Sequence, residues 1–264
     1  NALRFLLASL GAGLAALPKM RGMTRETRRY SLGLGVILGI VYMCSTVGLM
    51  YTSMSNAAFL CALAVVLTPI ANFIVYRQKP SRRLLLVLLL ALAGVALMTL
   101  TESLTPRLGD ILCILCAAFY AFDLLLAEHA VKRPRVDAFQ MGVLHLGFAG
   151  LLNLLLAFFL EKPALPHSGR VWGAVLFLAA FCTGLAFIAQ TMAQQYTTST
   201  HVGVIFALEP VFASIAAFIF TSERMNARGY LGAALLLAGM IIMELPIRVK
   251  KEPSQDEHSD LRQE

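Results

Sequence analysis

The chain has 264 residues, of which 58% are hydrophobic and only 14% are charged, and its formal net charge is +7. With a mean hydropathy of +0.74, it carries more apolar surface than a water-soluble domain of this size can bury, which excludes an ordinary soluble protein. A membrane β-barrel would need alternating segments of about ten residues, and the sequence contains none. Composition therefore predicts an all-α integral membrane protein.

Nine apolar stretches follow one another, each close to the roughly 20 residues that a helix needs to cross a bilayer. We expect spans at residues 1–17, 31–50, 55–76, 83–101, 109–131, 137–160, 171–192, 200–220 and 229–246. Gly35 and Gly39, four residues apart, and the small-residue runs at 8–16 and 232–239 predict close helix packing. Residues 247–264 are expected to form a charged, disordered tail.

Basic residues gather on one side of the predicted bundle. If the spans alternate in direction, fifteen Lys and Arg residues fall on one side and five on the other. Basic loops stay in the cytoplasm, so we place Asn1 outside and the tail inside an inner or plasma membrane. The charge thus reflects topology rather than nucleic-acid binding. The fifteen are Lys19, Arg21, Arg25, Arg28, Arg29, Arg77, Lys79, Arg82, Arg83, Lys132, Arg133, Arg135, Arg248, Lys250 and Lys251.

An internal repeat relates residues 45–100 to residues 190–245. At an offset of 145 about a third of the positions agree without a gap; Thr46 and Tyr51, for example, fall on Thr191 and Tyr196. The basic connection at 77–83 is predicted to be cytoplasmic, whereas its counterpart at 222–228 is predicted to lie outside. The two copies are therefore expected to have opposite orientations, as in many transporters.

Inverted repeats need an odd number of helices in each unit. Residues 109–246 offer five helices and residues 1–101 offer four. The segment 138–141 is similar to 2–5, which leaves the helix at 109–131 without a counterpart. We therefore expect a first repeat at 1–101 that lacks its opening helix, a second repeat at 109–246, and ten helices in the complete protein.

Several short motifs occur in a characteristic order. They are Ala-Leu-Arg-Phe-Leu-Leu-Ala at 2–8, Ser-Asn-Ala-Ala-Phe-Leu at 55–60, Leu-Glu-Pro-Val-Phe at 208–212 followed by Glu223-Arg224, and the small-residue helix from Gly232 to Gly239. Together they resemble the EamA-type permeases of the drug/metabolite transporter superfamily. The resemblance implies two inverted five-helix repeats and transport, often export, of small metabolites. Two positions depart from the pattern: Ala64-Val65 stands where the second copy has Glu-Pro, and Asp123 replaces an apolar or aromatic residue.

Charged groups inside predicted spans are candidate functional residues, because a bilayer offers them no water. Glu209 lies near the middle of its span beside Pro210, and it either fixes a kink or contacts substrate or a proton. Pro69 lies one turn beyond the matching position in the first copy, so both prolines are candidate hinges. Asp123, with Tyr120 on the same helical face, would favour cationic substrates or protons if it faces a cavity. Arg4 either reaches lipid headgroups, pairs with an acidic side chain or attracts an anionic substrate.

Uncharged hydrogen-bonding residues recur at matching places in the two copies. Tyr42 and Thr46 lie one helical turn apart, as do Gln190 and Gln194. Such polar stripes can exchange hydrogen bonds with a passing solute, but Ser and Thr also bond back to their own helix. Asn56 either lines the cavity or caps its helix. We predict a substrate and coupling site lined by Tyr42, Ser45, Thr46, Asn56, Tyr120, Asp123, Gln190, Gln194 and Glu209.

The function predicted from these features is a secondary transporter that moves a small organic metabolite by alternating access, with proton-coupled export as one form. A membrane-embedded enzyme and a non-transporting scaffold are the alternatives. The sequence has no Gly-x-Ser-x-Gly, His-Glu-x-x-His or Walker motif, so we expect no catalytic residue, cofactor or metal. Five cysteines lie within apolar spans, and Cys113 and Cys116 are interpreted as packing residues. The expected partners are the metabolite, the bilayer and a second copy in a homodimer.

Overall fold

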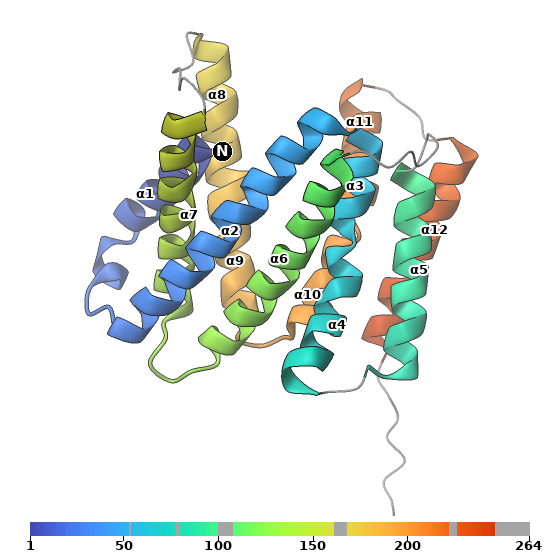
Figure 1. Cartoon of the computed structure of the whole chain (residues 1–264), viewed down its shortest axis with the longest axis horizontal. Helices are drawn as coiled ribbons and strands as arrows, with labels where there is room; N and C mark the ends of the chain where they lie inside the picture. The colour runs from blue at the N-terminus through green and yellow to red at the C-terminus, as the bar shows by residue number, and fades with distance from the viewer. Residues whose placement is uncertain (53, 78–79, 100–107, 161–167, 222–225, 246–264) are drawn as a thin grey trace, which may run out of the picture.

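The computed structural model describes residues 1–52, 54–77, 80–99, 108–160, 168–221 and 226–245 (Figure 1). This part of the chain is helical and contains no strand. The elements are α1 (Ala2–Ala15), the 3₁₀ turn η1 (Leu17–Met20), α2 (Arg25–Tyr51), α3 (Met54–Ala62), α4 (Ala64–Tyr76), α5 (Arg82–Thr99), α6 (Leu108–Val131), α7 (Ala138–Leu160), α8 (Gly169–Phe177), the π-helix η2 (Leu178–Leu185), α9 (Ala186–Ala193), α10 (Ser199–Phe206), α11 (Glu209–Thr221) and α12 (Ala227–Glu244). The predicted tail at 247–264 lies outside the described residues.

Helix length and surface chemistry confirm an all-α membrane protein. Five helical stretches are long and apolar enough to cross a bilayer: Arg25–Tyr51, Ala57–Tyr76, Leu108–Val131, Ala138–Phe159 and Gly169–Ala193. Three shorter apolar helices cover Ala2–Ala15, Ser199–Phe212 and Ala227–Met243. Large apolar side chains are exposed around the bundle, including Phe159, Phe212 and Leu89. So much exposed hydrocarbon suits lipid and not water.

Helix starts are set by local capping. The Thr24 hydroxyl accepts the Thr27 N–H at 3.0 Å before α2, and the Asn226 side-chain oxygen accepts the Gly229 N–H at 2.8 Å before α12. Before α10, Thr198 caps His201 in the same way. Each cap satisfies one of the backbone donors that the first turn of a helix leaves unpaired.

Successive transmembrane stretches run in alternating directions (Figure 1). In that view α1, α4, α6, α9 and α12 end at the lower end of the bundle, where α2, α5, α7 and α10 begin. The basic residues at the ends of these helices, such as Arg25, Arg77, Arg82 and Lys132, therefore gather at one end of the molecule. This is the charge asymmetry that the sequence predicts.

The helix boundaries repeat at the same offset as the sequence. Adding 145 to the bounds of α4 gives those of α11, and adding 145 to the bounds of α5 gives those of α12. The helices α5 and α12 pack against each other and run in opposite directions: Gly94 lies against Gly232, and Gly239 lies against Val87. The two copies thus share their helical pattern, and their last helices are antiparallel.

Both copies also carry an interrupted helix at the equivalent place. The break between α3 and α4 falls at Leu63, and the break between α10 and α11 falls at Ala207 and Leu208. Glu209 and Pro210 open α11, where an acidic side chain meets the positive end of the helix and a proline costs no hydrogen bond. Pro69 instead lies buried inside α4. In the first copy, therefore, the proline does not mark the start of the helix after the break.

The long helix α2 lies at the centre of the packing, against α6 and α7. Gly35 and Gly39 face Phe148 and Leu152 of α7 so closely that a Cβ at either glycine would clash. The close approach predicted for this glycine pair is confirmed. The first helix, α1, packs on α7 and η2. Helices of the two predicted repeats therefore pack against each other.

The stretch predicted as a single span at 171–192 contains a π-helical segment, η2. There the N–H of Ala186 reaches the carbonyl of Phe181, five residues back. Gly184 faces Ala8 of α1, and the buried hydroxyl of Thr183 has no hydrogen-bond partner. π-Segments inside α-helices often occur at functional sites, and hydropathy alone does not distinguish them from a regular helix.

Candidate functional site

An aromatic cluster joins α1, α2 and α9. The Tyr42 ring lies 4.7 Å from the Phe5 ring, edge to face, and 6.4 Å from the Phe187 ring. The Arg4 guanidinium lies 4.9 Å from the centroids of both Phe5 and Tyr42, at cation–π distance. Its Nε atom is buried and has no hydrogen-bond partner. A cation with an unused donor beside aromatic rings is suited to contact an anionic or aromatic solute.

Glu209 supplies the opposite charge to this region. It is exposed at the first turn of α11, three residues after Phe206. The Tyr120 ring stacks on Phe206, the last residue of α10, at 6.1 Å. The structure therefore brings two predicted site residues, Tyr42 and Tyr120, into one cluster with Arg4, and Glu209 follows shortly after the ring that stacks on Tyr120.

Asp123 is fully buried and faces a residue that our sequence reasoning missed. The Nε2 atom of His145, on α7, lies 3.3 Å from the Asp123 Oδ1 atom, and His145 is 2% exposed. The two groups meet the distance but not the alignment of a hydrogen bond, and among the described residues neither side chain has another hydrogen-bond partner. The rule that singled out Asp123, an ionisable residue inside an apolar span, applies equally to His145.

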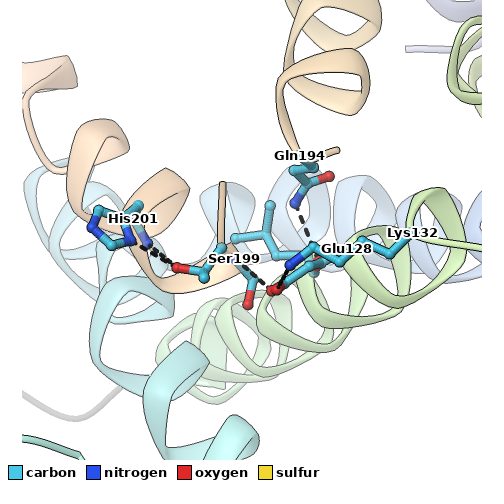
Figure 2. A network of polar contacts seen from close by, with 7 residues as sticks. Glu128, Lys132, Gln194, Ser199 and His201 are labelled. Carbon is cyan, nitrogen blue, oxygen red and sulfur yellow. Dashed lines mark hydrogen bonds and ion pairs between the residues drawn. The ribbon is translucent and has the colours of Figure 1, made fainter. Parts of the chain in front are cut away.

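Polar contacts tie α6 to the connection between α9 and α10 (Figure 2). The Gln194 Nε2 atom donates to the Leu124 carbonyl at 3.2 Å. The Glu128 carboxylate accepts the Ser199 N–H at 2.6 Å and the Lys132 ammonium at 2.6 Å. Gln194 is fully buried, whereas Gln190, one turn earlier, is half-buried. Gln194 thus closes a helix contact in this conformation.

The remaining predicted residues are more ordinary in this conformation. The Thr46 hydroxyl donates to the Tyr42 carbonyl at 2.7 Å and accepts the Asn1 side-chain amide at 2.7 Å. This is the back-bonding alternative of the sequence reasoning. Ser45 is half-buried on α2. Asn56 belongs to α3, but its side chain lies outside the described residues.

Two hollows among the described residues are lined by apolar side chains. A small one of about 10 Å³ lies between α3, α4 and α5 and is lined by residues such as Phe59, Val65 and Ala91. A larger one of about 340 Å³ opens between α4 and α5 and includes Pro69 and Pro80 in its lining. The polar residues above line neither. Within the same part of the chain, no three His, Cys, Asp or Glu side chains are grouped as metal ligands.

Comparison with known proteins identifies the family. Residues 1–100 and 107–245 match the EamA-like transporter family. The chain belongs to this family. An uncharacterized transporter of Archaeoglobus fulgidus is 30% identical to this EamA-like transporter over 250 residues, which cover 94% of this chain and 76% of the relative. The uncharacterized transporter YetK of Bacillus subtilis is 25% identical over 271 residues, covering 96% and 79%.

The helical arrangement has a relative among solved structures. A protein known from its crystal structure superposes on this EamA-like transporter with a TM-score of 0.76, covering 92% of this chain and 85% of that one, at 16% identity. Such low identity supports the fold alone. Family membership and the names of the relatives make this protein a multi-pass membrane transporter, as the motifs in the sequence predict.

Proposed function

We propose that this EamA-like transporter is a permease that moves a small organic metabolite by alternating access between two inverted repeats. Three observations support the inverted arrangement: the 145-residue offset of the helix boundaries, the opposite directions of α5 and α12, and the matching helix breaks at Leu63 and at Ala207–Leu208. Helices broken near the midplane and related by inversion are typical of sites that open to each side in turn.

The observation that carries this proposal is the cluster of Arg4, Tyr42 and Tyr120, with Phe206 stacked on Tyr120 just before Glu209. These residues come from α1, α2, α6 and the α10–α11 region, so both repeats contribute to one polar and aromatic centre, in which we include Glu209. A cation and a carboxylate beside tyrosines match a small solute with a charged group and an apolar body. We expect Ser45, Thr46, Asn56, Gln190 and Gln194 to contribute hydrogen bonds as the passage opens.

The orientation proposed here rests on the basic end of the bundle. We place the end that carries Arg25, Arg77 and Lys132 in the cytoplasm of an inner or plasma membrane, with Asn1 outside and the C-terminal tail inside. Export is the direction that we propose, in line with the behaviour that the family resemblance implies, and coupling to protons is a separate part of our proposal. A homodimer stays a prediction.

Counterflow in proteoliposomes tests the transport proposal. Vesicles loaded with each member of a panel of amino acids, amines and organic acids are given the same solute in labelled form outside. A permease accumulates label transiently for at least one solute, and Glu209→Gln lowers that rate by about tenfold, since one charge-assisted hydrogen bond to the solute is worth about 1.4 kcal/mol. Glu26→Gln, at an exposed carboxylate 3.7 Å from Arg135, is the matched control and keeps the rate.

The same assay separates the alternatives. Lipid turnover in the vesicles without counterflow would favour a membrane-embedded enzyme. The absence of both counterflow and turnover across the panel, with folded protein in the vesicles, would favour a non-transporting scaffold. Either result overturns the proposed function.

A further inference from the structure

The buried acid–imidazole contact between α6 and α7 has no role in the solute-binding centre. Asp123 and His145 are both at least 98% buried, and their closest N and O atoms lie 3.3 Å apart. The helices that carry them pack mainly through α2 and α9 rather than against each other. The two side chains therefore bridge a gap between helices, and their polar atoms are without aligned hydrogen bonds.

While water is excluded, a pair of this kind is stable only when it binds one proton. With one proton between them, the two groups carry no net charge, either as imidazolium and carboxylate or as imidazole and carboxylic acid. With no proton the pair carries one negative charge, and with two protons one positive charge, and each is costly to hold in a low-dielectric interior. When water reaches the pair, it solvates the charged forms and the preference for one bound proton is lost.

The charge of the pair depends on the groups that surround it. Tyr120, one turn away on α6, interacts electrostatically with Asp123, and Glu128 lies further along the same helix, paired with Lys132. Three contacts beside these residues come from uncharged side chains: Ser9 of α1 donates to the Val143 carbonyl, Thr191 of α9 lies against Gly142, and Gln194 donates to the Leu124 carbonyl. On α1 and α2, Arg4 and Tyr42 are ionisable and contact each other.

Position links the pair to the connection between α9 and α10. Leu124, the residue after Asp123, receives the Gln194 hydrogen bond from the end of α9, and Glu128, just over one turn later, holds the start of α10 (Figure 2). A displacement of the α9–α10 connection would break both contacts and bring water towards Asp123. The pair would therefore retain its proton while the α9–α10 connection is closed and release the proton when this connection opens.

We propose that Asp123 and His145 form a proton-binding site that carries one proton through the transport cycle, which couples solute movement to a pH gradient. The proposal rests on the proposed permease function. It assigns coupling to a pair on α6 and α7, separate from the centre formed by Arg4, Tyr42 and Glu209.

Solid-supported membrane electrophysiology measures the proton directly and needs no solute. Proteoliposomes receive a step from about pH 8 to about pH 6, which spans the ordinary pKa of histidine. Proton entry to a site inside the membrane displaces charge, so the wild type gives a transient current that scales with protein density. Asp123→Asn and His145→Gln each reduce the displaced charge by about tenfold, because burial keeps a lone imidazole deprotonated and a lone carboxyl protonated, so neither variant changes its proton count over the step.

Two matched controls and a rescue make the result specific. Glu26→Gln and His129→Gln, at exposed residues of the basic end, keep the wild-type current. The exchanged double variant, Asp123→His with His145→Asp, restores one acid and one imidazole in contact and recovers most of the current. An unchanged current in Asp123→Asn, or no current in the wild type, overturns the proposal.

The outcome is distinguishable from a failure of the permease proposal. If the pair couples transport, the two single variants keep counterflow, in which no proton gradient is used, and lose uptake driven by a pH gradient. A wild type that gives the proton current but no counterflow for any solute overturns the permease function and leaves the proton site standing. Counterflow with gradient-driven uptake intact in both variants removes the coupling role.

Discussion

The Glu128 carboxylate on α6 lies 2.6 Å from the backbone N–H of Ser199, the first residue of α10. An acidic group from one helix thereby caps the start of another, where unpaired backbone donors and the helix dipole favour negative charge. The neighbouring ion pair with Lys132 is partly exposed and adds little. This contact joins the two helices at the basic end of the bundle.

We predict that Glu128→Ala loosens this end without unfolding the bundle. Loss of a charged cap costs about 1–2 kcal/mol, so the α9–α10 connection should separate from α6 more often. In a Thr200→Cys background, a membrane-impermeant maleimide applied to the basic end should label the thiol several-fold faster when Glu128 is Ala. Lys132→Ala is the control, since it removes the exposed partner and keeps the cap. Equal labelling rates would show that the cap does not hold this end shut.

A second prediction concerns Glu209. Its carboxylate stands exposed at the first turn of α11. Glu209→Gln should leave thermal stability almost unchanged, because an acidic residue at a helix start contributes about 0.3–1 kcal/mol. Counterflow of an accepted solute should fall strongly in the same variant. A large drop in unfolding temperature with transport intact would assign Glu209 to the helix break alone.

Span positions could be predicted well from sequence, because length and hydropathy decide them. The expected spans at 109–131 and 137–160 correspond to α6 at Leu108–Val131 and α7 at Ala138–Leu160. The repeat at 145 also predicts the equal lengths of α4 and α11. The break at Leu63 was not predicted, because Leu63 has no local helix-breaking character and Pro69, the expected hinge, lies inside α4. Tertiary packing decides where that helix is interrupted.

The site was predictable as a set of residue types but not as a set of contacts. The intramembrane charge rule identified Asp123 and applies equally to His145, which lies 22 residues away on another helix and gives no local sign of pairing. Gln190 and Gln194 were expected to share a helical face. However, α9 ends at Ala193, so Gln194 lies at the end of the helix and reaches α6 instead. Helix ends that depend on packing limit such spacing arguments.

Two cysteines offer a test of the packing between α3 and α6. The Cys61 and Cys116 sulfur atoms lie 3.8 Å apart. We predict that copper phenanthroline, a membrane-permeant oxidant, joins them into a disulfide: two thiols lose two protons, and two electrons pass to the oxidant. The bond would tie α3 to α6 and should slow counterflow in a way that dithiothreitol reverses. Peptide mass spectrometry identifies the linked pair.

Cys61→Ala is the control for this cross-link, because it removes one partner and should leave counterflow insensitive to the oxidant. Cys182, which is exposed on η2, reports oxidation away from the contact. Slowing of the Cys61→Ala variant by the oxidant would mean that the α3–α6 contact is not the cause.

Two neighbouring glycines on α2 give opposite predictions. A Cβ at Gly33 would meet one atom of Leu126 at 3.9 Å, an ordinary contact, so Gly33→Ala should keep or slightly raise stability through the better helix propensity of Ala. A Cβ at Gly35 would clash with Phe148 and press on the Ala149 nitrogen and the His145 carbonyl oxygen at 3.1 Å. Gly35→Ala should therefore cost about 1–3 kcal/mol, the usual range for overpacking.

Thermal unfolding in detergent compares the two glycine variants directly. Because the Gly35 clash falls on the backbone of His145, Gly35→Ala should also weaken the proton current assigned to Asp123 and His145, whereas Gly33→Ala should leave it intact. Equal stability of the two variants would contradict the close packing of α2 on α7. A destabilised Gly35→Ala variant with a full proton current would mean that the acid–imidazole contact tolerates a shift of α7 and does not depend on the glycine for its geometry.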